Sequence, residues 1–245
     1  MGRNSASSED LYGPEFFRSI ADGSYASARA AWPHIMSALN HPVQSIVDFG
    51  CGPGAWLAAF RDLQPGVELL GVDHPGARAY PLMIDNDQLR EADLSTDIDL
   101  CRSFDLCVSL EVAEHLPETS AKRFIRTLTN HSDTILFSAA IPMQGGTGHI
   151  NCRWPSYWRD LFTDCGFRCF DRVRPQIWTN KTIALHYRQN ALIFSRRDLG
   201  PPRDGVADWG GADIVHPQLF EGFWPTHVPR TPRNLLKFFL GTLHG

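Results

Sequence analysis

A glycine-rich loop at residues 48–54, with the sequence DFGCGPG, could do the most recognisable chemistry in this chain. It follows a short β-branched run and precedes a helical segment. Glycines at alternate positions let the backbone turn sharply and let a ligand lie against bare main chain. The helix that follows offers unpaired N–H groups and the positive end of its dipole. The loop therefore favours a negatively charged or zwitterionic ligand.

The spacing of these glycines narrows the choice of ligand. A phosphate-binding loop requires a lysine after its last glycine, and none follows here. The third glycine also comes one residue too early for the dinucleotide fingerprint. A second apolar run, residues 67–72, then delivers Asp73, whose carboxylate can accept hydrogen bonds from both hydroxyls of a ribose. The alternative is an ordinary strand–turn–helix with a surface aspartate, but the loop and Asp73 together favour a nucleoside site.

A second group of chemical side chains follows an apolar strand at residues 104–110. Glu111, Glu114 and His115 have i, i+3, i+4 spacing, so on a helix they would share one face. His149 comes from a separate glycine-rich segment that could fold over the same cleft. Two carboxylates and two imidazoles suit an octahedral Mg²⁺ or Mn²⁺ site with open positions for a substrate hydroxyl.

This group has two other interpretations. Glu114, His115 and His149 could act directly in catalysis, with His149 as a general base. A histidine in this position could also pack beside the ligand without any metal. The sequence leaves these alternatives open.

Strands and helices alternate between residues 45 and 195, which predicts a mostly parallel α/β sheet with helices on both faces. The expected strands are residues 45–49, 67–72, 82–84, 104–110, 134–138, 167–173 and 191–195. The expected helices are residues 20–39, which Pro33 could split, 55–63, a stretch beginning at residues 112–116, 121–129 and 154–165.

The end of the chain breaks this alternation. Residues 198–245 are rich in proline and glycine and predict an irregular C-terminal extension, closed by a short amphipathic helix at residues 235–243. We therefore expect one functional domain over residues 1–197, with N-terminal helices, followed by the extension.

The composition, with 43% hydrophobic and 20% charged residues, fits a globular protein. A net charge of −4 argues against a protein that mainly grips nucleic acid. Six cysteines without a C-x-x-C pair predict free thiols. No signal peptide opens the chain, and no run approaches the roughly 20 apolar residues that span a bilayer. We expect a cytoplasmic protein without a membrane span, and the sequence does not indicate its oligomeric state.

The glycine loop and Asp73 resemble motif I and its following acidic residue in class I S-adenosylmethionine-dependent methyltransferases. The resemblance implies a doubly wound, Rossmann-like sheet of seven strands with one reversed hairpin at its edge. It also implies S-adenosylmethionine as the cofactor. Residues 104–111 resemble motif IV, whose strand end lines the cofactor and faces the substrate. The residues that the resemblance assigns to the cofactor are Asp48, Gly50, Cys51, Gly52, Gly54, Asp73, His74, Asp93, Leu94, Leu110 and Glu111.

The resemblance also implies individual roles. Asp48 would lie beneath the loop near the cofactor's amino group, and Asp73 would bind the ribose hydroxyls. His74 would lie beside the adenine, and Asp93 with Leu94 would hold the adenine edge.

The likeness extends over about residues 11–196. Residues 137–142, 145–151, 154–158 and 187–190 resemble a bacterial methyltransferase subgroup whose substrates are mostly unassigned. That subgroup tends to carry Glu after the Asn, where this chain has Cys152. The Glu-x-x-Glu-His spacing, with a later histidine, resembles the metal site of small-RNA 2′-O-methyltransferases. It is also similar to a stretch of the ubiquinone-biosynthesis O-methyltransferases.

These observations predict methyl transfer from S-adenosylmethionine to an oxygen or nitrogen of a small-molecule or glycan-type acceptor. One alternative is a metal-dependent RNA 2′-O-methyltransferase, against which the acidic charge and single catalytic domain argue. A second alternative is a non-catalytic cofactor-binding protein on the same fold, because fold does not entail turnover.

Overall fold

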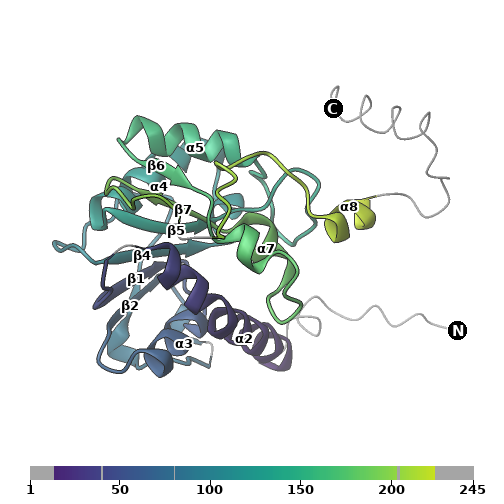
Figure 1. Cartoon of the computed structure of the whole chain (residues 1–245). Coiled ribbons are helices and arrows are strands. Elements are labelled where there is room, and N and C mark those ends of the chain that lie inside the picture. Colours follow the sequence, from purple (N-terminus) through teal and green to yellow (C-terminus); the bar gives the residue numbers. More distant parts are fainter. Residues whose placement is uncertain (1–13, 40, 80, 203–204, 224–245) are drawn as a thin grey trace, which may run out of the picture. The chain divides into compact units, whose positions relative to one another are not determined.

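The computed structural model describes residues 14–39, 41–79, 81–202 and 205–223 (Figure 1). The chain forms two compact units, residues 1–214 and residues 215–245. The second unit contains helix α8 (Pro217–Phe223). The helix expected at residues 235–243 lies outside the described residues. Within the described ranges, no helix is both long and apolar enough to cross a membrane.

A seven-stranded sheet in the order β3-β2-β1-β4-β5-β7-β6 forms the centre of the first unit. Neighbouring strands from β3 to β5 are parallel, whereas β7 is antiparallel to both β5 and β6. The mostly parallel, doubly wound sheet with a reversed edge is therefore confirmed. The strands are β1 (Ser45–Phe49), β2 (Glu68–Asp73), β3 (Leu89–Glu91), β4 (Leu106–Leu110), β5 (Thr134–Ser138), β6 (Arg168–Phe170) and β7 (Leu192–Ser195).

Helices cover both faces of this sheet. They are α2 (Pro14–Ala38), α3 (Ala55–Leu63), α4 (Glu118–His131), α5 (Pro155–Asp164), α6 (Arg174–Ile177) and α7 (Leu185–Asn190). Helix α2 is continuous through Pro33, whose ring is exposed. The carbonyl that loses its hydrogen bond to proline belongs to Arg29, which is also exposed, so water can satisfy it.

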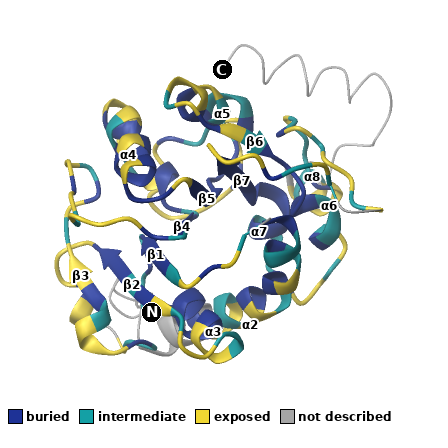
Figure 2. Ribbon diagram, turned by 60° about the vertical axis from the view of Figure 1, so that its left-hand side comes forward, coloured by how far each residue is buried: buried dark blue, intermediate teal, exposed yellow. Residues whose placement is uncertain are grey.

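The core lies in two layers, one on each face of the sheet (Figure 2). Successive strand residues point to opposite faces, so Ile46 packs with α2 and α3, while its neighbour Val47 packs with α4 and α5. In β4, Val108 packs in the layer with α2 and α3, and its neighbour Cys107 packs in the layer with α4 and α5. Burial on both faces explains why these strands are apolar throughout instead of alternating.

The strand expected at residues 82–84 is wrong. The third strand is Leu89–Glu91, which pairs in parallel with β2. Residues 82–84 turn under the glycine loop instead, where the N–H of Met83 donates to the carbonyl of Pro53 at 2.7 Å. An apolar run of three residues carries no period that separates a strand from a buried turn.

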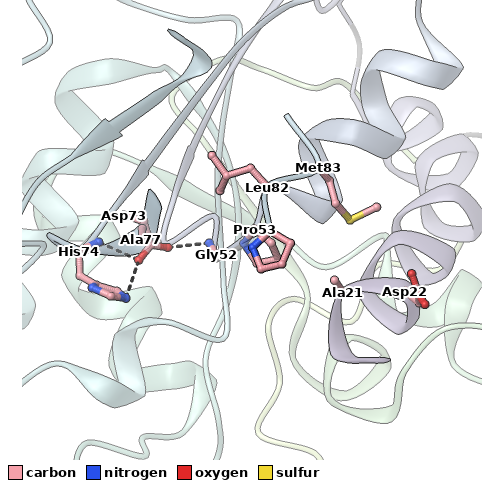
Figure 3. A pocket seen from close by; sticks show the side chains of 10 residues that line it. Ala21, Asp22, Gly52, Pro53, Asp73, His74, Ala77, Leu82 and Met83 are labelled. Atoms are coloured by element: carbon pink, nitrogen blue, oxygen red, sulfur yellow. Dashed lines mark hydrogen bonds and ion pairs between the residues drawn. The ribbon is translucent and has the colours of Figure 1, made fainter. Parts of the chain in front are cut away.

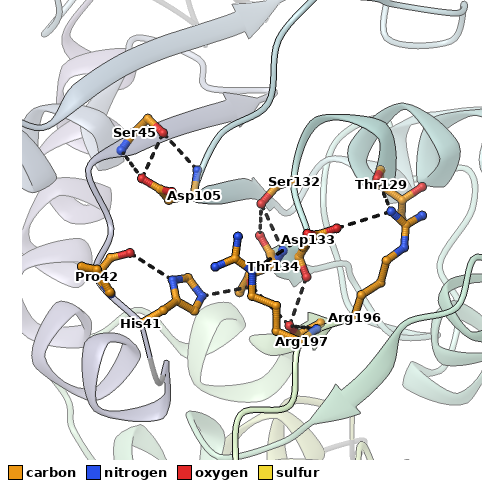
Figure 4. Close-up of polar contacts among 11 residues, drawn as sticks. His41, Pro42, Ser45, Asp105, Thr129, Ser132, Asp133, Thr134, Arg196 and Arg197 are labelled. Atoms are coloured by element: carbon orange, nitrogen blue, oxygen red, sulfur yellow. Dashed lines mark hydrogen bonds and ion pairs between the residues drawn. The ribbon is translucent and has the colours of Figure 1, made fainter.

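Polar side chains fix the amino ends of the strands, away from the end where the glycine loop lies (Figure 4). Asp105 accepts hydrogen bonds from the backbone and hydroxyl of Ser45, which ties β1 to the start of β4. His41 and Thr134 are hydrogen-bonded at 3.1 Å, with either ring tautomer possible. These contacts anchor the sheet and leave its carboxyl edge available for a site.

Residues 199–212, which lie beyond the expected boundary, belong to the first unit and are bonded within it. Arg172 donates to the carbonyls of Leu199 and Gly200, and it pairs with Asp208 at 3.0 Å. Arg174 forms a fully buried ion pair with Asp171 and also donates to the carbonyl of Ala212. The division of the chain at residues 197–198 stays a prediction about where the functional domain ends.

Candidate active site at the carboxyl ends of β1, β2 and β4

The glycine loop connects β1 to α3 and holds three glycines in the left-handed region. Their φ angles are 87° at Gly50, 53° at Gly52 and 83° at Gly54, a conformation that other residues adopt only with strain. A Cβ on Gly50 would lie 2.2 Å from Cγ2 of Val112, and one on Gly54 would lie 2.8 Å from Ile84. No neighbouring atom lies within 4 Å of the corresponding position at Gly52. The middle of the loop therefore presents open main chain.

Asp73, the last residue of β2, holds this loop. Its Oδ2 accepts a hydrogen bond of 2.6 Å from the backbone N–H of Gly52 (Figure 3). Its Oδ1 accepts a hydrogen bond of 2.7 Å from the backbone N–H of His74. Gly52, Asp73 and His74 all line one pocket of about 380 Å³. The remaining lining residues are Ala21, Asp22, Pro53, Ala77, Pro81, Leu82 and Met83.

This pocket fits the nucleoside part of S-adenosylmethionine. It combines apolar walls, an exposed stretch of main chain at Gly52 and a carboxylate with unused lone pairs at Asp73. The sequence had singled out Gly52, Asp73 and His74. It missed the contributions of helix α2 and of residues 81–83, because apolar residues on a helix or a turn carry no sequence signal of their own.

Two further loop residues are buried beneath this surface. Burial raises the pKa of the Asp48 carboxyl well above its ordinary value, and the charge of Asp73 raises it further. Cys51 is buried too, and its Sγ would lie 2.5 Å from a Cβ on Gly71, so its side chain fills the space that this glycine leaves. Cys51 thus supports the loop from below through its side chain.

Asp93 and Leu94 lie outside the residues that line this pocket. Asp93 is exposed, and its carboxylate accepts hydrogen bonds from the backbone and hydroxyl of Ser95. These hydrogen bonds lower the pKa of Asp93. Leu94 is buried in the core layer beside α4 and α5. The structure therefore shows local structural contacts for both residues.

Glu111 immediately follows Leu110, the last residue of β4, and has a φ of 56°. This left-handed residue interrupts the segment, and only a 3₁₀ turn, Ala113–His115, follows it. The shared helical face expected for Glu111, Glu114 and His115 is therefore absent. Instead, the carboxylate of Glu111 accepts hydrogen bonds from Gln144 at 2.8 Å and Asn190 at 3.0 Å.

Glu114 is fully buried, and neither carboxylate oxygen has a hydrogen-bond partner among the described residues. Burial raises the pKa of this carboxyl to about 9, and the charge of Glu111 adds to the rise. A buried, unpartnered carboxylate is costly, so Glu114 is either protonated or awaits a cation.

Two histidines lie beside Glu114. Nδ1 of His115 is 3.2 Å from the carbonyl of Gly148, and Nδ1 of His149 is 3.2 Å from the carbonyl of Gln144. A carbonyl only accepts, so these contacts assign the proton of each neutral ring to Nδ1 and leave Nε2 as a free acceptor. The rings meet edge to face at 4.8 Å between centroids.

Glu114, His115 and His149 can together offer ligand atoms that all lie within 4.8 Å of one another. The orphaned carboxylate and the two imidazoles, each fixed through Nδ1, fit the chemistry of a divalent metal site. Glu111, which the sequence also assigned to the metal, is outside this group, and its two oxygens accept hydrogen bonds from Gln144 and Asn190. The sequence did not assign roles to Gln144 and Asn190, since a lone amide carries no spacing pattern.

A comparison with family models relates this geometry to known proteins. A model described as "Methyltransferase domain" matches residues 24–139, the part that contains the glycine loop, Asp73 and the Glu111 turn. No curated protein matches the chain.

Solved structures share the fold. DesVI of Streptomyces venezuelae has a TM-score of 0.58 at 12% identity, with 78% of this chain and 100% of DesVI covered. Human N-acetylserotonin methyltransferase, crystallised with S-adenosylmethionine, has a TM-score of 0.50 at 16% identity, with 75% of this chain and 55% of the human chain covered. The small RNA methyltransferase HEN1 has a TM-score of 0.52 at 15% identity, with 85% and 28% covered.

This chain thus spans about half the length of the human enzyme and a smaller part of HEN1. At these identities the likeness to the solved structures is one of fold. The matched methyltransferase domain covers just under half of the chain and the fold agrees with it, so together they support a class I S-adenosylmethionine-dependent methyltransferase.

Proposed function

We propose that the protein transfers a methyl group from S-adenosylmethionine to an oxygen or nitrogen of a small-molecule or glycan-type acceptor. The hydrogen bond between Gly52 and Asp73 at the wall of the 380 Å³ pocket carries this proposal. It places open main chain and a carboxylate side by side, which suits a zwitterionic nucleoside. The pocket wall also includes His74, which we assign to the adenine side.

The sulfonium of the bound cofactor supplies an electrophilic methyl group. The protein must then orient the acceptor and remove a proton from it. We assign the second task to Nε2 of His149, which is a free acceptor because Nδ1 faces the carbonyl of Gln144. The proton passes from the acceptor's hydroxyl or amine to this nitrogen. Burial, and next the charge of His149, lower the pKa of His115, which favours its neutral form.

A divalent metal at the same residues is a second candidate role for this site, and it would take the place of the His149 base, because Nε2 of His149 cannot bind a metal and accept a proton at once. Glu114, His115 and His149 would hold Mg²⁺ or Mn²⁺, which would orient an acceptor hydroxyl and lower its pKa. The carboxylate of Glu114 has no hydrogen-bond partner among the described residues, which supports a cation beside it.

Calorimetry with S-adenosylhomocysteine tests the cofactor site. We expect Asp73→Ala to abolish measurable binding, because the carboxylate holds the loop and faces the ribose. Asp87→Ala, at an exposed position outside the lining residues, is the matched control and should bind like the unaltered protein. Equal affinity of the Asp73→Ala variant and the control would overturn the ribose assignment.

Methyl incorporation from labelled S-adenosylmethionine tests the acceptor class. Small hydroxylated compounds, soluble glycans and small RNA are offered separately, each with and without a chelator. Labelling of a small compound or glycan supports the proposal. Labelling restricted to RNA would contradict it, and loss of labelling with chelator would support the metal.

A further inference from the structure

The carboxylate of Glu111 is held by two buried amides from distant parts of the chain. Gln144, in the β5–α5 connection, donates Nε2 to Oε2 at 2.8 Å. Asn190, at the end of α7, donates Nδ2 to Oε1 at 3.0 Å and to Oε1 of Gln144 at 2.9 Å. Because Nδ2 faces two acceptors, the orientation of the Asn190 amide follows from the network.

Two features of this hydrogen-bond network raise the free energy of the folded protein. Glu111 has a φ of 56°, which a residue with a side chain adopts only with strain. Asn190 directs its N–H groups at Glu111 and Gln144, and its own buried Oδ1 has no partner within the described part of the chain. Such costs persist where the surrounding structure imposes them, and they concentrate at functional sites. We therefore interpret the network as one that holds the carboxylate of Glu111 in a fixed position.

Glu111 also stands next in the chain to a residue that packs on the proposed cofactor loop. Val112, the next residue after Glu111, packs against Gly50 so closely that a Cβ there would lie 2.2 Å from Cγ2. Glu111 is only partly buried, so its oxygens keep some access. Gln144 also connects the carboxylate to the proposed base, since its backbone carbonyl faces Nδ1 of His149 at 3.2 Å.

We infer that Glu111 accepts a hydrogen bond from the nucleophilic X–H group of the methyl acceptor, and that Gln144 and Asn190 are its positioning residues. The inference rests on the proposed methyl transfer. It selects acceptors that carry a hydrogen on the nucleophile, namely a hydroxyl or a neutral amine. The amides of Gln144 and Asn190 each take one lone pair, one on either oxygen, so the lone pairs that remain can accept a hydrogen bond from a donor on the ligand.

Sinefungin provides a test that needs no known acceptor. This analogue carries an amine where the cofactor carries its methyl group, so the amine occupies the place that the acceptor's nucleophile approaches. S-adenosylhomocysteine has no group there. The ratio of the two dissociation constants, measured by calorimetry on the full chain, therefore reports a hydrogen-bond acceptor at that place.

We expect the unaltered protein to bind sinefungin about tenfold or more tightly than S-adenosylhomocysteine, the factor expected of a hydrogen bond to a charged group. Glu111→Gln, Gln144→Ala and Asn190→Ala should each reduce this preference toward unity and keep the affinity for S-adenosylhomocysteine. Asn130→Ala, at an exposed position on α4, is the matched control and should keep the preference.

Three results would overturn the inference. The unaltered protein could show no preference, or the variants could retain it. A parallel loss of both affinities in Glu111→Gln, with circular dichroism unchanged, would place Glu111 at the methionine end of the cofactor instead. If the unaltered protein binds neither compound, the proposed function itself fails, and that outcome is distinct from these three. A single variant that does not fold leaves the other two to decide.

Discussion

Val112 occupies the space that a side chain at Gly50 would need: a Cβ on Gly50 would lie 2.2 Å from its Cγ2. This contact joins the loop after β1 to the turn after β4. Since β1 and β4 are neighbours in the sheet, the two carboxyl ends meet here. The proposed cofactor loop and the segment that carries Glu111 and Glu114 are thus packed against each other.

The Gly50 contact yields a prediction with an internal control. Gly50→Ala should abolish S-adenosylhomocysteine binding, because the new methyl displaces Val112 and shifts the loop. Gly66→Ala is the control, since Gly66 has nearly the same φ, 88° against 87°, but no atom near its Cβ position. Gly66→Ala should cost about 1–2 kcal/mol of stability from the left-handed backbone alone and keep full binding. Calorimetry and urea unfolding measure the two effects.

A second substitution checks the cause of that loss. The double variant Gly50→Ala, Val112→Ala removes both methyl groups of Val112 that the new Cβ would meet, and we expect it to regain part of the binding. Failure of the double variant to bind more tightly than Gly50→Ala alone would exclude the clash as the main cause.

The pKa of Glu114 predicts how stability depends on pH in the metal-free protein. The folded pKa of about 9 lies above the ordinary value of 4.5, so the folded state binds more protons than the unfolded state between these values. This group's contribution is fully present below pH 4.5 and is lost as pH rises through 9. Relative to Glu114→Gln, the unaltered protein should lose up to about 1.4 kcal/mol of unfolding free energy per pH unit.

Urea unfolding in EDTA at pH 5.5, 7.0 and 8.5 measures this difference. Glu118→Gln, at an exposed position on α4, is the control and should give curves parallel to those of the unaltered protein. A constant difference between Glu114→Gln and the unaltered protein across this range would show that Glu114 is not protonated in the folded state.

Metal binding should release a proton. Mn²⁺ requires the charged form of Glu114, which burial otherwise keeps protonated at neutral pH. Calorimetry at pH 7 in buffers of different ionisation enthalpy should therefore give a release of about one proton per Mn²⁺. His149→Ala should weaken binding, whereas His41→Ala, at the opposite end of the sheet, should not. Heats that do not depend on the buffer would contradict the role of Glu114.

The buried ion pair between Arg174 and Asp171 predicts a large loss of stability on substitution. Arg174 is 0% exposed and also donates to the carbonyls of Gln189 and Ala212. Arg174→Ala leaves the Asp171 carboxylate buried without its cation, so unfolding should require about 3–5 kcal/mol less. Arg168→Ala is the exposed control and should change stability by less than about 1 kcal/mol. Similar midpoints for both variants would refute this account.

The sequence predicted the sheet well where strands are long and buried on both faces. Val47 and Val108 lie in such strands, and the apolar runs around them indicate a buried strand. Strand β3, with the sequence LRE, was missed because it is short and only Leu89 is buried. Its pairing comes from β2, which supplies a free edge, and single-sequence patterns do not report that.

The site shows a similar division. The sequence brought Asp73 and the glycines to one edge of the sheet, and the structure joins them there through the hydrogen bond from Gly52 to Asp73, whereas their cofactor roles stay a prediction. The turn at Glu111 could not, because the residue adopts a conformation that its own type disfavours. The hydrogen bonds from Asn190 and Gln144 join residues 79 and 33 positions away from Glu111. No local pattern encodes such separations.

The reversed strand β7 has a consequence for how the enzyme can be divided. Leu192, its first residue, pairs with Phe137 near the carboxyl end of β5, so the residues just before it enter the same edge as the glycine loop. A fragment trimmed to residues 24–139 would lose Ala21 and Asp22 from the pocket wall, and with them Gln144, His149 and Asn190. The residues that we assign to the acceptor therefore come from both sides of residue 139, Glu111 before it and His149 after it, and neither part of the chain holds them all.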